Sequence, residues 1–320
     1  MSAKTILVTG GHGFIGSNMI RYYLNKYPDY QFINIDYNTV AANPENIDCP
    51  EQSARYAFHR VDIRNAYAIN HLFELYDITD ILHFAAETRD ADHVGEIRLY
   101  EQTNVLGLLN LLQAAETAWM EGAHQPKAKY AASRFHHISL ARNESNNLYS
   151  ISKANADAMV QGFHKKTGLN IVTTASPEVF GPMQQEDELI PSTIRKALND
   201  ELVNPQGQSG KTRDWLFVGD LCEAIDTVFH LGDAGQSYEI GFNARVADGV
   251  LAEQIKAMLG KDFPGNKASL KDKLLYSKVA FIPQPQVLGF SPFTLFENGL
   301  RMTLGWYIKK YKHTEFLKRR

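Results

Sequence analysis

The chain has 320 residues, of which 44% are hydrophobic and 22% are charged, and its formal net charge at pH 7 is −3. This composition is typical of a soluble globular protein with one large domain or two moderate ones. The slight negative charge argues against a nucleic-acid-binding protein, which usually carries a basic excess. The two cysteines, Cys49 and Cys222, suit neither a disulfide framework nor a metal site, so a reducing compartment is expected.

The sequence also predicts no membrane segment. No stretch approaches the roughly 18 consecutive apolar residues that a membrane-spanning helix needs. Residues 1–4 lead directly into the first expected strand, without the charged and apolar regions of a signal peptide. We therefore expect a cytoplasmic protein.

Strand-like and helix-like segments alternate through the first half of the chain. We expect, in chain order, a strand at 5–8, a helix at 16–26, strands at 31–36 and 56–61, a helix at 66–75, a strand at 80–86, a helix at 103–117, a strand at 134–139, a helix at 148–166 and a strand at 169–174. Repeated strand–helix units predict a parallel sheet with helices on both faces.

After residue 175 the pattern changes to short apolar pieces separated by Pro, Gly and polar clusters, with helices expected at 191–199 and 250–259. We therefore predict one domain at 1–175 and a smaller lobe at 176–320. Residues 236–240 are expected to return from this lobe to the sheet.

Residues 6–16 contain a short β-branched apolar run, then Gly10, Gly13 and Gly16, and then an apolar helical pattern. A tight turn at Gly10 needs backbone freedom, Gly13 lets a pyrophosphate approach the backbone, and Gly16 lets the helix pack on the sheet. The helix N-terminus offers N–H groups and a positive dipole end to the phosphates. A glycine-rich turn without a ligand is the alternative, and the surrounding strand, helix and acid favour a dinucleotide site.

That acid is Asp36, which ends the strand at 31–36 and is placed to accept hydrogen bonds from the adenosine ribose. It would repel a 2′-phosphate, and the next residues, Tyr37 and Asn38, carry no positive charge, so NAD is favoured over NADP. Asp62 ends a later strand, where it either meets the adenine amino group or caps the helix at 66–75.

Tyr149 and Lys153 lie one helical turn apart on one face of the helix at 148–166, for which Asn147 is the expected N-cap and Gly168 the C-terminal stop. A lysine ammonium beside a phenol favours the phenolate form. Such a tyrosine takes a proton from a sugar hydroxyl as hydride leaves the carbon, and the lysine also holds the nicotinamide ribose. An ordinary helix surface is the alternative interpretation.

Three histidines lie in or beside expected core strands: His83, His136 and His137. They have no acidic or thiol partners at a suitable spacing, so we predict no metal site.

Together, the glycine turn and the Tyr149–Lys153 pair resemble the extended short-chain dehydrogenase/reductases, and among them the dTDP-glucose 4,6-dehydratases. Further segments similar to that branch span nearly the whole chain, at 9–18, 83–88, 104–107, 135–139, 181–182, 189–191, 213–218, 288–290, 296–300 and 306–307. The resemblance implies an α/β fold, a Rossmann-type doubly wound parallel sheet with a smaller C-terminal α/β substrate lobe. It also implies a homodimer in which the helices at 103–117 and 148–166 pair with a second subunit.

In that family NAD⁺ takes hydride from C4 of a nucleotide-diphosphate sugar with help from the tyrosine, water leaves across C5 and C6, and hydride returns to C6. The resemblance implies cofactor contacts from Gly10, Gly13, Phe14, Ile15, Gly16, Asp36, Asp62, Ile63, Phe84, Ala85, Ala86, Tyr149 and Lys153. It implies substrate contacts from Glu87, Glu178 and Arg213. Arg213, which this sequence shares with the family, is suited to pair with a diphosphate oxygen.

The substrate side departs from the family's pattern. The family's Thr-Asp-Glu, which supplies a hydroxyl, an acid and a base after the His-Ile-Ser strand, reads Leu140-Ala141-Arg142 here, and a loop before the tyrosine helix is shortened. Ser139 is a candidate to replace the hydroxyl, or else a serine bound to backbone or cofactor. Glu144 and Glu178 are candidate acids or bases, or else solvated carboxylates. Glu188 replaces a lysine near the expected sugar diphosphate.

Three functions remain open. The first is an NAD-dependent nucleotide-sugar 4,6-dehydratase that uses Tyr149, Lys153 and Ser139. The second is a 4-epimerase or another redox enzyme of the same superfamily, which needs the tyrosine and the hydride shuttle but not the missing acid and base. The third is an NAD-binding homologue without dehydratase activity.

Overall fold

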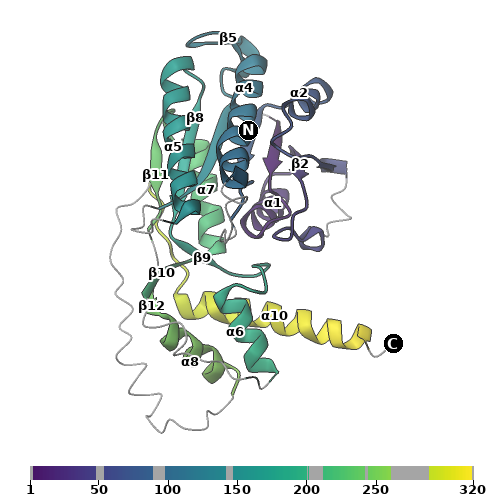
Figure 1. Ribbon diagram of the computed structural model, residues 1–320, viewed down its shortest axis with the longest axis vertical. Coiled ribbons are helices and arrows are strands. Elements are labelled where there is room, and N and C mark those ends of the chain that lie inside the picture. The colour runs from purple at the N-terminus through teal and green to yellow at the C-terminus, as the bar shows by residue number, and fades with distance from the viewer. Residues whose placement is uncertain are drawn as a thin grey trace. The chain divides into compact units, whose positions relative to one another are not determined.

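The computed structural model describes residues 3–47, 54–88, 98–141, 147–199, 201, 212–241, 244–260 and 288–318. The chain forms two compact units (Figure 1). The first comprises Met1–Ser176, Cys222–Ile240 and Val287–Gly289, and the second comprises Pro177–Leu221, Gly241–Gln286 and Phe290–Arg320.

A seven-stranded sheet forms the centre of the first unit, in the order β11-β8-β7-β4-β1-β2-β3. Its strands, all parallel, are β1 (Lys4–Thr9), β2 (Tyr30–Asp36), β3 (Tyr56–Arg60), β4 (Asp80–His83), β7 (Arg134–Leu140), β8 (Ile171–Ser176) and β11 (Ser237–Glu239). Every residue of β4 and β8 is buried, as expected for parallel strands covered on both faces. Strand order reverses between β1 and β4, where such sheets bind ligands. The predicted doubly wound sheet is confirmed.

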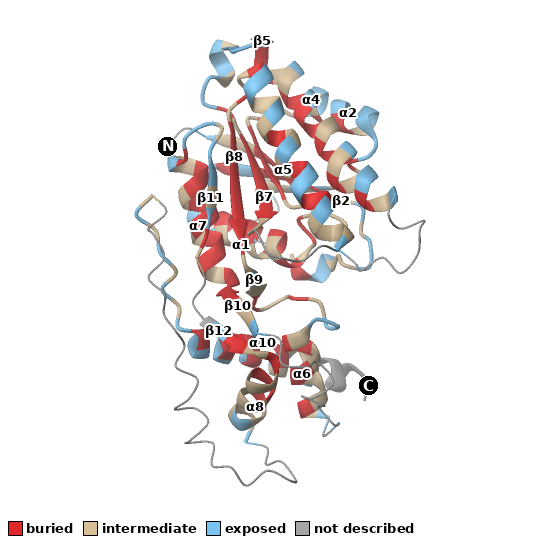
Figure 2. Ribbon diagram, turned by 60° about the vertical axis from the view of Figure 1, so that its left-hand side comes forward, coloured by how far each residue is buried: buried red, intermediate tan, exposed pale blue. Residues whose placement is uncertain are grey.

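Helices cover both faces of this sheet (Figure 2). One face carries α2 (Ala66–Leu75), α4 (Leu108–Trp119) and α5 (Leu148–Thr167), whose apolar residues join those of the strands in one buried cluster. The other face carries α1 (Phe14–Lys26) and α7 (Val218–Leu231), which are joined by a 2.6 Å hydrogen bond from Lys26 Nζ to Asp226 Oδ2. Short elements connect these layers: the turns η1 (Pro44–Asn46) and η4 (Ala128–Tyr130) and the hairpin strands β5 (Met120–Gly122) and β6 (Gln125–Pro126).

The helix predicted at 148–166 has the expected ends, whereas the helix predicted at 103–117 differs from the prediction. The ends of α5 are as predicted: Asn147 accepts a hydrogen bond from the Ser150 N–H, and Gly168 adopts the left-handed conformation at φ 73°. The helix expected at 103–117 instead begins as a π-helix, η3 (Glu101–Gly107), and continues as α4. Gly107 packs so closely on Ile63 that a Cβ would lie 2.7 Å from that side chain.

The described part of the second unit contains a three-stranded sheet in the order β12-β10-β9 and three helices. The strands are β9 (Glu178–Phe180), β10 (Thr212–Phe217) and β12 (Ala244–Ala247), and the helices are α6 (Leu189–Leu198), α8 (Asp248–Met258) and α10 (Phe296–Lys318). Its core is aromatic: the Phe180 ring lies 5.9 Å from Trp215, 5.7 Å from Phe217 and 5.0 Å from Phe296. Across the described part of the chain, no helix combines the length and apolar character needed to cross a membrane.

Candidate functional site

The glycine turn after β1 is shaped by close backbone contacts. Gly10 has φ 71°, and a Cβ there would lie 2.7 Å from the amide nitrogen of Ala85. A Cβ on Gly16 would lie 2.9 Å from the Cα of Gly11 and closer still to the Gly10 carbonyl oxygen. Because the N-cap of α1 is Gly13, no capping side chain covers the helix N-terminus, and the first turn carries no acid. This end of α1 therefore offers an anion its N–H groups and positive dipole.

Asp36, at the end of β2, is fixed by backbone donors on both sides. Its Oδ2 accepts a 3.1 Å hydrogen bond from the His12 N–H, and its Oδ1 accepts a 2.8 Å bond from the N–H of Asn38. His12 is buried, stacks on Phe58 at 4.3 Å and bonds the Asn38 side chain at 2.7 Å. Each carboxylate oxygen can accept a second hydrogen bond, as a ribose requires. Our sequence reasoning missed His12, although it lies between two glycines of the turn.

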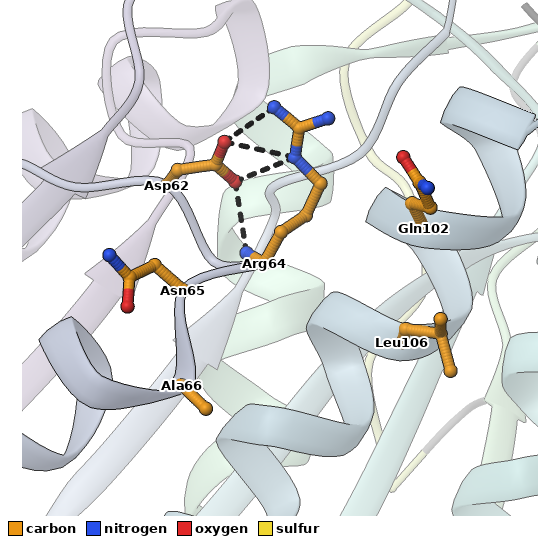
Figure 3. A pocket seen from close by; sticks show the side chains of 6 residues that line it. All are labelled: Asp62, Arg64, Asn65, Ala66, Gln102 and Leu106. Atoms are coloured by element: carbon orange, nitrogen blue, oxygen red, sulfur yellow. Dashed lines mark hydrogen bonds and ion pairs between the residues drawn. The ribbon is translucent and has the colours of Figure 1, made fainter.

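Asp62 lies beside a cavity of about 640 Å³ (Figure 3). The cavity is lined by Asp62, Arg64, Asn65, Ala66, Gln102 and Leu106. Burial tends to raise the pKa of Asp62, but hydrogen bonds from Arg64 outweigh it and lower that pKa below its usual value. The N-cap of α2 is Asn65, whose side chain accepts from the Ala68 N–H at 3.1 Å. The alternative prediction that Asp62 caps this helix is therefore wrong.

The segment that follows β4 is held at both ends. The Thr9 carbonyl accepts from the Phe84 N–H at 3.0 Å, and the Thr9 hydroxyl accepts from the Ala85 N–H at 3.2 Å. Further on, the Glu87 N–H donates to Asn104 Oδ1 at 2.7 Å, and Asn104 Nδ2 donates back to the Glu87 carbonyl at 3.0 Å. Residues 84–87, which the sequence predicts to contact the cofactor and the substrate, are thus half-buried and follow the carboxyl end of β4.

Tyr149 and Lys153 occupy one face of the first two turns of α5. Lys153 is only 7% exposed, and its Nζ donates a 2.8 Å hydrogen bond to the Ile138 carbonyl on β7. Burial lowers the pKa of Lys153 to about 8, and the Asp157 carboxylate opposes this shift. Tyr149 is half-buried, and its ring lies 6.3 Å from that of Tyr100. The arrangement brings a titratable ammonium to the end of β7.

Asp157, one turn beyond Lys153, is a member of this site that sequence reasoning missed. Its Oδ2 accepts a 2.9 Å hydrogen bond from Ser139 Oγ, and its Oδ1 lies 3.1 Å from His137 Nε2. Burial raises the pKa of Asp157, but His137, Ser139 and Lys153 together lower it below its usual value. The continuation of the 149–153 stripe to position 157 was the available sequence signal. The Ser139 hydroxyl is therefore engaged by a carboxylate.

His137 is neutral near pH 7. Burial and the Lys153 charge lower its pKa to about 4, although Asp157 raises it. A neutral imidazole next to an ionised carboxylate must carry its proton on Nε2 in order to donate to Asp157. His83 stacks on His137 at 5.5 Å and bonds the Thr9 hydroxyl at 2.7 Å. The described residues contain no cluster of three or more side chains that could hold a metal ion.

The segment after Ser139 supplies no acid or base where the structure describes it. Leu140 ends β7, and the Ala141 N–H donates to the Ser176 carbonyl at 2.8 Å. Arg142 and the candidate Glu144 lie outside the described residues.

In the second unit, Arg213 on β10 binds two carboxylates. Its Nε lies 2.9 Å from Asp248 Oδ1 and its Nη1 lies 3.1 Å from Glu178 Oε1. Burial would lower the pKa of Arg213, but Asp248, Glu178 and Glu188 together raise it. Two residues that sequence reasoning assigned separately to substrate binding, Arg213 and Glu178, therefore contact each other.

Comparison with known proteins agrees with this geometry. The profile of the NAD dependent epimerase/dehydratase family matches residues 6–241. A dTDP-glucose 4,6-dehydratase from Haemophilus influenzae is 33% identical over 335 residues, covering 95% of this chain and 97% of that protein. The chain is similar to the crystal structure of a dTDP-glucose 4,6-dehydratase from Bacillus anthracis in complex with NAD, with a TM-score of 0.78 and 29% identity, covering 97% of this chain and 98% of that one. It is also similar to the crystal structure of a dTDP-glucose 4,6-dehydratase from Streptomyces venezuelae with NAD bound, with a TM-score of 0.77 and 28% identity, covering 96% of this chain and 98% of that one. The chain belongs to the NAD dependent epimerase/dehydratase family.

Proposed function

We propose that this protein is a cytoplasmic NAD-dependent enzyme that oxidises a nucleotide-activated sugar at C4, of the dTDP-glucose 4,6-dehydratase type. The observation that carries the proposal is the placement of Tyr149 and the buried Lys153 on α5, with the lysine bound to the carboxyl end of β7. The full-length similarity to dTDP-glucose 4,6-dehydratases supports the substrate class.

The residues of the first unit fit NAD. The close-packed turn at Gly10 and Gly16 leaves backbone N–H groups for a pyrophosphate. Asp36 accepts the ribose hydroxyls, and its charge disfavours a 2′-phosphate. The segment from Phe84 to Ala86 approaches Gly10 of the turn, and we assign cofactor contacts to it and to the buried Ile63. When bound, NAD⁺ supplies the hydride acceptor.

In the proposed reaction, Tyr149 removes the proton from the C4 hydroxyl as hydride leaves that carbon. The Lys153 ammonium stabilises the negative charge on the tyrosine oxygen and holds the nicotinamide ribose. Its binding to the Ile138 carbonyl fixes the direction from which this charge acts. Ser139 donates to Asp157, so we assign the serine a positioning role at the end of β7.

A second candidate, a 4-epimerase or related redox enzyme, is favoured by one observation. The described residues after Ser139, Leu140 and Ala141, carry no acid or base for removing water. Oxidation and reduction at C4 need only the tyrosine, the lysine and the cofactor. A third possibility is a homologue that binds NAD without turnover.

Turnover assays distinguish the three. The protein is incubated with NAD⁺ and a panel of dTDP-, UDP- and GDP-hexoses, and products are separated by chromatography and analysed by mass spectrometry and NMR. Loss of one water with formation of a 4-keto-6-deoxy sugar supports the dehydratase, and an isomer of unchanged mass supports the epimerase. NAD binding without any product contradicts both enzymes for those sugars. Tyr149→Phe should abolish turnover, and activity retained in that variant would refute the role of Tyr149.

We also propose a homodimer formed through η3, α4 and α5. Leu106 on η3 and Ile151 on α5 are 48% and 46% exposed. These side chains lie on elements that the family resemblance places in the dimer interface, and there they are available to a second subunit. A second copy of the chain is the partner that the family resemblance implies.

A further inference from the structure

The two carboxylates that bind Arg213 occupy different environments. Asp248 contacts the Nε edge of the guanidinium, with Nε to Oδ1 at 2.9 Å and Nη2 to Oδ2 at 3.4 Å. Glu178 contacts Nη1 alone, at 3.1 Å. The Asp248 side chain is 3% exposed, whereas that of Glu178 is 39% exposed. One edge of Arg213 is therefore held by a buried partner and the other by a solvated one.

This difference decides which carboxylate can leave. Removing one partner from a buried ion pair leaves an uncompensated charge and is strongly unfavourable. An exposed ion pair contributes little, because water screens both charges and the side chains lose freedom. The Arg213–Asp248 contact is thus a fixed part of the fold, and the Arg213–Glu178 contact can be exchanged for another anion.

The strands hold Glu178 beside the Nη1 edge of Arg213. Glu178 pairs in register with Trp215 in the parallel β9–β10 ladder, two residues along from Arg213. Side chains alternate along a strand, so Arg213, Trp215 and Glu178 share one face of the sheet. The Arg213 guanidinium also lies 6.0 Å from the Trp215 ring. Glu188 adds a third negative charge to the field at Arg213.

We propose that Glu178 is a specificity-determining residue that occupies the anion-binding edge of Arg213 and weakens the binding of nucleotide diphosphates. A phosphate oxygen reaches Nη1 only by displacing the Glu178 carboxylate, which then repels the bound phosphate. The inference rests on the proposed function in one respect, that the ligand of the second unit is a nucleotide-activated sugar. It adds that Glu178 lowers the affinity for the diphosphate group at a position where Arg213 alone would bind this group more tightly.

Isothermal titration calorimetry of the full chain tests this inference, with dTDP, UDP and inorganic pyrophosphate as ligands. Glu178→Gln keeps the side-chain size and removes the charge. We expect it to bind diphosphates about five- to tenfold more tightly than the unmodified protein, with NAD affinity unchanged. Unchanged or weaker diphosphate binding in this variant, or no binding of any diphosphate by either protein, would overturn the proposal.

Asp214→Asn is the matched control. Asp214 lies on the opposite face of β10, where it pairs with Arg245 at 2.6 Å, and its loss changes the net charge equally. We expect its diphosphate affinity to stay close to that of the unmodified protein, and an equal gain in both variants would reduce the effect to net charge and refute the proposal. Adding Arg213→Met to Glu178→Gln should remove the gain. These binding results do not depend on turnover, so failure of the proposed reaction remains distinguishable.

Discussion

At the scale of single residues, the main feature of the proposed catalytic region is the arrangement of charges and hydrogen bonds around the buried Lys153. A buried ammonium is costly, and Asp157 is the carboxylate that offsets this cost while binding Ser139 and His137. The carboxylate therefore acts on the lysine through charge and on β7 through hydrogen bonds. Both effects converge on the end of the strand where Tyr149 is proposed to act.

Replacing Asp157 by Asn should shift the pH dependence of the enzyme. Burial lowers the Lys153 pKa to about 8 and Asp157 opposes it, so without the carboxylate that pKa falls further. The ammonium is then lost at a lower pH, and the alkaline limb of kcat/KM moves to lower pH. The same shift should appear in NAD affinity measured against pH. Asp157→Glu serves as the control and should restore the limb, whereas an unmoved limb in Asp157→Asn would contradict the assigned role.

The buried imidazole of His137 should make stability depend on pH. Its pKa is lowered to about 4 in the folded protein, so the unfolded chain binds more protons between pH 4 and 6.5. The contribution is fully present above pH 6.5 and is lost as pH falls toward 4, at about 1.4 kcal/mol per pH unit. His137→Gln keeps an N–H donor without titrating, so urea unfolding should show a shallower pH slope. Equal slopes in both proteins would disprove the prediction.

At the scale of elements, strand ends and helix starts create the proposed cofactor site. The β1–α1 turn can be this tight because two glycines allow its backbone segments to approach each other closely. The end of β2 places Asp36 where two backbone N–H groups donate to its carboxylate. The π-helical turn η3 places Asn104 where it binds Glu87 and, through Nδ2, the Ser152 hydroxyl at 2.9 Å. Single π-turns within helices are frequent at functional sites.

Two glycine-to-alanine substitutions distinguish the effect of close packing at a glycine from the effect of helix propensity on stability. Gly16→Ala should weaken NAD binding and lower stability, because its Cβ would meet the backbone of Gly10 and Gly11. Gly162→Ala on α5 has nothing within 4 Å of the added Cβ and should stabilise the protein by about 0.5–1 kcal/mol. Calorimetric binding and thermal unfolding measure both effects. Equal NAD affinity in the two variants would argue against a close-packed dinucleotide turn.

At the scale of the whole molecule, the proposed dimer predicts an effect of surface substitutions on mass. Leu106→Glu or Ile151→Glu introduces a charge into the proposed interface and should shift the protein toward the monomer in light-scattering measurements. Leu75 on α2 is 56% exposed and lies outside that surface, so Leu75→Glu is the control. A monomeric unmodified protein would rule out the proposed dimer.

Local signals allowed much of the fold to be predicted, and long-range contacts account for what was missed. Asn147 and Gly168 mark the ends of α5 because capping depends on neighbouring residues alone. The split of the expected 103–117 helix depends on Gly107 meeting Ile63, and the engagement of Asp157 depends on side chains of a distant strand. Spacing alone does not specify such contacts. The Arg213–Glu178 pair, 35 residues apart, escaped prediction for the same reason.

The order in which the strands of the first unit follow one another along the chain has a consequence for biosynthesis. β8 is buried along its whole length, and its outer edge pairs with β11, which is synthesised some sixty residues later. A nascent or truncated chain that stops near residue 176 therefore lacks the partner of a strand that is buried in the folded protein, and the open strand edge is a template for intermolecular pairing. A chaperone that shields this edge until β11 emerges would protect the growing polypeptide. Fragments cut between the two strands should aggregate rather than fold.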